Sequence, residues 1–138
     1  MKTLFSCLCL LFITTSNAQD IRGTWKSSSL IKDKEIEEYT LSPAEENDHW
    51  GLFINFTDLN TFTSYSSWPC GNDCFITAKG TYNLSSSTIS FFLIDVKFNK
   101  EYCGDMKPLE NTNLGTFTIT HNGENIILKK VKKQSSKY

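Results

Sequence analysis

The side chains best suited to chemistry in this sequence are two histidines and a small group of cysteines. His49 directly follows Asp48, so its imidazole could serve as a general base with an acid beside it. His121 stands next to an Asn-Gly pair that is typical of an exposed turn. A nucleophilic pair of His49 with a cysteine has no supporting spacing, and the sequence has no glycine-rich phosphate loop or nucleophile elbow. We therefore predict no catalytic residue, and we expect the protein not to be an enzyme.

Residues 1–18 have the three parts of a secretory signal peptide. Met1–Thr3 carries a positive charge, Leu4–Ile13 is apolar, and Thr14–Ala18 ends in small residues. We predict cleavage after Ala18, which leaves residues 19–138 as a single domain of ordinary length. An apolar run of about ten residues is too short to span a bilayer, and no later stretch is long and apolar enough, so we expect no transmembrane segment. The predicted location is secreted or periplasmic.

Three cysteines, Cys70, Cys74 and Cys103, lie within the predicted mature chain. An oxidising compartment favours one disulfide and leaves one thiol over. We favour Cys74–Cys103, because both residues stand at the ends of predicted strands. Cys70–Cys103 is the alternative, and a short Cys70–Cys74 bridge is the least favoured. With His49 these cysteines could form a zinc site, but Cys-x-x-x-Cys is not a strong zinc spacing. We predict no metal site and no cofactor.

The charge of the chain argues against a nucleic-acid partner. The formal net charge is −1 and Arg22 is the only arginine, so neither a dominant basic surface nor bidentate base recognition is supplied. The basic tail, Lys132–Tyr138, could dock on an anionic membrane or polymer, although a solvated tail is the simpler interpretation. Aromatic residues make up 13% of the chain, which is ample material for a core.

Alternation of polar and apolar residues predicts strands along most of the mature chain. A glycine, a threonine and an aromatic residue recur three times, as Gly23-Thr24-Trp25, Gly80-Thr81-Tyr82 and Gly115-Thr116-Phe117. We expect each of these aromatic side chains to turn into the core. The predicted strands are Arg22–Ile31, Glu35–Leu41, Trp50–Thr57, Thr61–Trp68, Phe75–Leu84, Thr88–Phe98, Gly115–Thr120 and Asn125–Val131.

Three segments add detail to this β pattern. Thr88–Phe98 is apolar on both faces, which predicts either an outer cover or a β-bulge. Ser42–Glu46 has a serine cap followed by proline and predicts at most one short helical turn. Asn122-Gly123 predicts the last hairpin. Short sequential connections between the strands predict an all-β fold, an eight-stranded antiparallel up-and-down β-barrel, since closure removes the open edges of a sheet.

The first of the three repeated motifs, Gly23-Thr24-Trp25, resembles the opening of the lipocalins and fatty-acid-binding proteins, the calycin group. The chain looks most like the small secreted lipocalin-like domains of bacteria. The resemblance covers the Gly-x-Trp site, the length of the mature chain and the layout of the predicted strands. It implies a barrel whose floor is plugged by Trp25 and which encloses a small ligand.

The aromatic interior of such a barrel has two possible uses. The residues expected to line a ligand cavity are Trp25, Trp50, Phe56, Phe91, Phe117 and Ile119. In that case the protein binds a small hydrophobic molecule. The alternative is that these side chains fill the interior. The barrel would then be a solid protein-interaction or inhibitor module, which meets a protein partner through the Cys70–Cys74 loop or the outer face of Thr88–Phe98.

Overall fold

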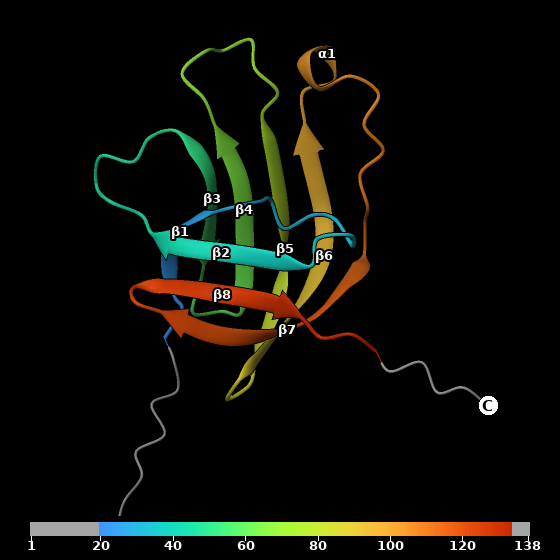
Figure 1. Ribbon diagram of the computed structural model, residues 1–138. Helices are drawn as coiled ribbons and strands as arrows, with labels where there is room; N and C mark the ends of the chain where they lie inside the picture. Colours follow the sequence, from blue (N-terminus) through green and yellow to red (C-terminus); the bar gives the residue numbers. More distant parts are fainter. Residues whose placement is uncertain (1–19, 134–138) are drawn as a thin grey trace, which may run out of the picture.

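The computed structural model describes residues 20–133, so the predicted signal peptide lies outside the described residues. Within that range the chain forms eight strands and one short helix (Figure 1). The strands are β1 (Gly23–Ser27), β2 (Glu38–Pro43), β3 (Gly51–Phe56), β4 (Thr61–Ser67), β5 (Ile76–Leu84), β6 (Thr88–Phe98), β7 (Thr112–Asn122) and β8 (Asn125–Lys130). The helix α1 (Lys100–Cys103) is a single turn. No helix in this part of the chain has the length and hydrophobicity that a membrane span needs.

The eight strands close into one antiparallel barrel, which confirms the predicted fold class. Around the ring the neighbours are β1, β2, β8, β7, β6, β5, β4 and β3, and β3 pairs with β1 to complete it. From β3 to β8 each strand pairs with the strand that follows it. The first two strands depart from this order, because β1 lies between β2 and β3. The connection from β2 to β3 therefore crosses the outside of β1.

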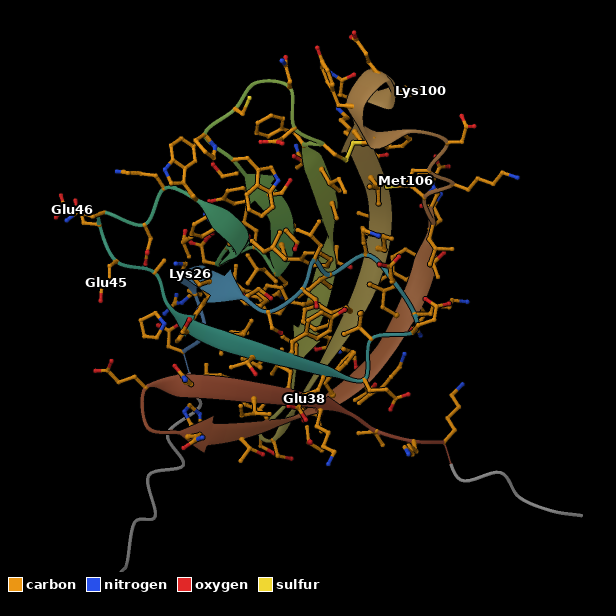
Figure 2. The ribbon with its side chains drawn as sticks, turned by 45° about the horizontal axis from the view of Figure 1, so that its top comes forward. Lys26, Glu38, Glu45, Glu46, Lys100 and Met106 are labelled. Carbon is orange, nitrogen blue, oxygen red and sulfur yellow. A yellow bond between two sulfur atoms is a disulfide. The ribbon has the colours of Figure 1, made fainter. Side chains whose placement is uncertain are left out.

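The crossing connection is tied to β1 by an ion pair. Lys26 Nζ donates to Asp48 Oδ1 at 3.0 Å, and the other carboxylate oxygen accepts the backbone N–H of Glu45 at 2.8 Å. The hydrogen bond from Glu45 and then Lys26 lower the pKa of Asp48. In Figure 2, Lys26 lies beside the loop that carries Glu45 and Glu46. The single helical turn that the sequence allowed for Ser42–Glu46 does not form there, because the first two of these residues extend β2 and the rest belong to this connection.

The long strand β6 contains a β-bulge, one of the two features that its two apolar faces predicted. The bulge brings Val96 to the inner face, while Phe92 and Ile94 point outward and are exposed. Lys79 of β5 pairs with Asp95, but the next residue, Gly80, pairs with Leu93, so Ile94 has no partner on β5. The inward-facing residues are Ile89, Phe91 and Leu93 before the bulge and Val96 after it. Gly80 itself is required by close packing, since a Cβ there would lie 2.1 Å from the carbonyl oxygen of Phe92.

The three glycine-led motifs send their aromatic side chains inward, as expected. Tyr82 and Phe117 are buried, and Trp25 is half-buried against the core. The indole Nε1 of Trp25 donates to the carbonyl of Ile21 at 2.8 Å. The hydroxyl of Tyr82 donates to the carbonyl of Thr57 at 2.6 Å. Trp25 and Tyr82 lie at the end of the barrel at which β1 begins, and the polar side-chain atom of each is hydrogen-bonded there.

The segment between β1 and β2 covers the interior from the other side. The predicted strand Arg22–Ile31 is too long, because the chain leaves the sheet after Ser27. Ile31 is completely buried, and its backbone N–H donates to Ser64 Oγ at 3.0 Å. Ser64 is a buried hydroxyl on the inner face of β4. A buried N–H needs a partner, so this serine fixes the segment across the core.

The disulfide Cys74–Cys103 joins the loop between β4 and β5 to α1, which confirms the favoured pairing (Figure 2). Cys70 is an exposed free cysteine. The helix was not expected from the sequence. Its N-cap is Asn99, whose side-chain oxygen accepts the backbone N–H of Glu101 at 3.0 Å.

Candidate functional site

The interior of the barrel is a cluster of aromatic rings centred on Phe91. Its ring centroid lies 5.4 Å from that of Phe62, 5.7 Å from Phe117, 6.3 Å from Phe56 and 6.5 Å from Tyr39. Each of these side chains is at most 1% exposed. Separations of this size are those of rings in direct contact. Three of the predicted ligand-lining residues, Phe56, Phe91 and Phe117, therefore pack on one another.

The other three predicted ligand-lining residues lie further out. Trp25 and Ile119 are half-buried and pack against the edge of the core. Trp50 is 53% exposed and lies in the connection before β3, where its ring meets that of His49 at 6.3 Å. The strand begins only at Gly51, which has a φ of +127°. The alternation inferred for Trp50–Thr57 does not include its first residue, so Trp50 does not join the interior group.

One polar atom in the interior is unpaired. The hydroxyl of Tyr39 is buried and has no hydrogen-bond partner among the described residues. Burial, and to a smaller extent the nearby charge of Asp33, raises the pKa of Tyr39 far above its ordinary value. The ring itself is well packed, 5.4 Å from Phe117. Tyr39 therefore supplies apolar contacts, while its hydroxyl loses its bonds to water on folding.

The candidate chemical side chains do not form a catalytic group. His49 and His121 are both exposed and lie in different parts of the barrel, one in the crossing connection and one near the end of β7. Two of the three cysteines in residues 20–133 are joined in the disulfide. In residues 20–133, no three His, Cys, Asp or Glu side chains gather closely enough to hold a metal ion.

A cleft of about 730 Å³ lies on the outside of the barrel where β8 ends. Three segments line it: residues 34–37 before β2, residues 113–116 of β7 and residues 130–133 at the end of β8. Two backbone hydrogen bonds hold these segments together. The N–H of Lys130 donates to the carbonyl of Glu37, and the N–H of Val131 donates to the carbonyl of Thr116, both at 2.8 Å.

The cleft is strongly cationic. Its charged lining consists of four lysines, Lys34, Lys130, Lys132 and Lys133, and one acid, Glu37. Lys130 is held in place, because its Nζ donates to the carbonyl of Lys34 and lies 5.8 Å from the ring centre of Phe117. Lys132 and Lys133 are exposed. We call this feature the lysine cleft. It can attract anionic groups, and the sequence showed only a basic tail at this place.

Comparison with protein-family models, with curated proteins and with solved structures found no match to this chain. Two features of the molecule bear on its function: a barrel filled with aromatic rings and a cationic cleft on its outer surface.

Proposed function

We propose that this protein is a protein-interaction module, in which the interior of the barrel serves only stability and the partner binds to the outer surface. The observation that carries this proposal is the packing around Phe91, whose ring contacts four other rings. Pockets for small molecules usually have volumes of about 300–1,000 Å³ and apolar walls. Here the apolar side chains meet one another at the centre of the barrel.

Access to the interior also favours an outer binding surface. Ile31 covers one side of the core and is anchored to Ser64. Trp25 and Tyr82 close the end where β1 begins. A ligand could reach the centre only if one of these covers moved and the rings separated, which would cost several contacts at once. The lysine cleft, in contrast, is open to solvent without any rearrangement.

An exported protein is the setting that we propose for this function. The signal-peptide pattern of residues 1–18 supports it. The disulfide Cys74–Cys103 adds support, because disulfides are common in secreted proteins and rare in reducing compartments. The resemblance to calycins stays part of the proposal, supported by the closed barrel and by the inward-facing Trp25. On this proposal the protein has a calycin-like barrel whose interior is filled by its own side chains and not by a ligand.

Titration with N-phenyl-1-naphthylamine, a neutral apolar fluorophore, tests the proposal. We expect no saturable rise in fluorescence with the unaltered protein. The matched variant Phe91→Ala removes the central ring, and we expect it, if it stays folded, to bind benzene but not the larger fluorophore, because a dry apolar cavity of about one ring accepts only small aromatic molecules. Saturation of the unaltered protein near one fluorophore per chain would refute the proposal and would favour a ligand-binding barrel instead.

A further inference from the structure

We infer that the lysine cleft takes an acidic, extended peptide segment of a partner protein, which adds to the open edge of β7 as a further strand. This inference rests on the proposed function and names the chemistry of the partner. It joins two independent observations at one place: a stretch of strand that lacks a neighbour on one side, and a concentration of positive charge beside it.

The open edge is the first part of β7. Thr112, Asn113 and Gly115 pair with β6, and β7 pairs with β8 only from Phe117 onwards. The carbonyl of Thr116 accepts one backbone hydrogen bond, from the N–H of Val131, the residue after β8. In the described part of the chain, no strand pairs with residues 112–115 on the side away from β6. Such an edge is a template for an added strand.

The edge is open because the two strands part at a bulge. Leu114 has no partner on β6 and is 1% exposed, so it turns into the core. Gly115, next to it, has a φ of +105°, which bends the strand. Among the described residues, the chain after β8 makes one backbone hydrogen bond to β7, from the N–H of Val131 to the carbonyl of Thr116. The resulting opening is the lysine cleft. Its edge is four residues, or about 13 Å, long, and within it the N–H of Gly115 already donates to Asn113 Oδ1 at 2.9 Å, so a peptide would pair with the other backbone groups of residues 112–115.

The charge of the cleft selects an acidic segment. Four lysines and one glutamate line it, although the whole chain carries a formal charge of −1. These lysines come from two segments that line the cleft with the open edge: Lys34 precedes β2, and Lys132 and Lys133 follow β8. In an added strand, side chains alternate between two faces. A peptide with glutamate at alternate positions would therefore direct one row of carboxylates to these lysines, while its backbone pairs with β7.

Binding of a designed peptide to the full mature chain tests this inference. The probe is a fluorescently labelled ten-residue peptide that alternates glutamate and valine, measured by fluorescence anisotropy in 50 mM salt. Its matched control has the same sequence with N-methyl groups on alternate amides, which removes ladder donors and leaves the charge unchanged. We expect saturable binding of the first peptide and at least a tenfold weaker affinity for the control.

Charge-reversed variants separate the lysine cleft from general attraction. Lys132→Glu combined with Lys133→Glu should weaken binding of the alternating peptide at least tenfold, because both side chains are exposed and line the cleft. The matched control is Lys97→Glu combined with Lys100→Glu, two exposed lysines elsewhere on the surface. It should change the affinity less than threefold. Both variants should unfold at the same temperature as the unaltered protein, since none of the four side chains is buried.

Amide hydrogen exchange reports strand addition directly. Exchange at residues 112–115 should become slower when the peptide is bound. The inference is overturned if the peptide does not bind, if the two double variants weaken binding equally, or if exchange at the edge is unchanged. It is also overturned if binding appears only after residues 134–138 are deleted, because the chain's own end would then be the occupant. Failure of the proposed function would show separately, as saturable binding of the apolar fluorophore that is unaffected by the Lys132 and Lys133 substitutions.

Discussion

Replacement of Phe91 by alanine is the sharpest test of a barrel filled by its own side chains. Phe91 is 1% exposed, and its ring contacts four other aromatic rings. Removal of a fully buried phenylalanine costs about 3–5 kcal/mol, because apolar contacts are lost and a cavity remains. The loss of favourable ring pairs adds to this cost. We therefore expect a decrease of about 4 kcal/mol in the free energy of unfolding, or about 10–20 °C in melting temperature.

The adjacent residue provides the control. Phe92 has the same side chain and lies on the same strand, but it points outward and is 41% exposed. Phe92→Ala should cost about 1 kcal/mol or less, since no closed cavity forms. Phe91→Leu preserves most of the apolar volume and should cost about 1–2 kcal/mol, so a measurable variant remains if the alanine variant does not fold.

Urea unfolding monitored by tryptophan fluorescence and by circular dichroism measures all three changes. The slope with urea should be unchanged, so that differences in midpoint report stability. The reasoning is refuted if Phe91→Ala costs no more than Phe92→Ala, because the centre of the barrel would then contain space or solvent. Such a result would also remove the main support for the interaction-module proposal.

Four further variants test separate features of the fold. Gly80→Ala should destabilise the protein by about 3 kcal/mol or prevent folding, because the new Cβ would meet a backbone oxygen at 2.1 Å. Cys74→Ser combined with Cys103→Ser should cost about 3–4 kcal/mol, since the disulfide constrains a loop with a sequence separation of 29 residues. Tyr39→Phe should be neutral or stabilising by about 1 kcal/mol at pH 7, because the buried hydroxyl it removes is unpaired. Tyr82→Phe should instead cost about 1 kcal/mol, because that hydroxyl donates to a carbonyl.

Thermal unfolding at a series of pH values extends the test of Tyr39. Its raised pKa means that the folded chain holds the phenolic proton more tightly than the unfolded chain does. The contribution of Tyr39 to the free energy of unfolding is therefore complete at pH values below the ordinary tyrosine pKa of 10.0, and it is lost as the pH rises above that value. Tyr39→Phe should remove the part of the decrease in stability at alkaline pH that is due to this tyrosine. An identical alkaline loss in both proteins would contradict the burial of this hydroxyl.

The Gly80→Ala variant and the double cysteine variant each have a matched control. Gly71→Ala lies in a loop with nothing near the added Cβ, and it should change the free energy of unfolding by less than about 0.5 kcal/mol. Cys70→Ser removes the free cysteine and should leave the urea midpoint unchanged under oxidising conditions. If Cys70→Ser destabilised the protein as much as the double cysteine variant, the assignment of the disulfide would be wrong.

The sequence predicted the strands well because alternation is a local signal. Residues Thr88–Phe98 were placed with the correct bounds, and the conflict between their two apolar faces correctly indicated a bulge. The hairpin at Asn122-Gly123 also formed as predicted, with Gly123 at a φ of +62°. The strand bounds and the hairpin depend on residues that are neighbours in the chain, whereas the choice between a bulge and an outer cover needed the register of β6 against β5.

The errors arose where distant contacts decide the structure. Ile31 continues an apolar pattern, yet it leaves the sheet because Ser64, far along the chain, binds its backbone. Trp50 fits the alternation of β3, but the strand begins one residue later. The lysine cleft depends on a bulge in β7 and on the point where β8 ends. The positions of the lysines in the sequence predict neither of these features. Local patterns can show which residues are basic but not that they surround an open strand edge.

The position of β1 between its two neighbours has a consequence for how the chain reaches its final state. The barrel is completed only when β2 pairs with β8, with Glu38 opposite Lys129. During synthesis from the amino end, β2 is therefore made long before β8, the strand with which it pairs. Contacts between such distant residues are entropically costly to close and are made slowly. Until then, β2 would expose an unpaired strand edge to other molecules, which makes the incomplete chain prone to aggregation and a substrate for chaperones.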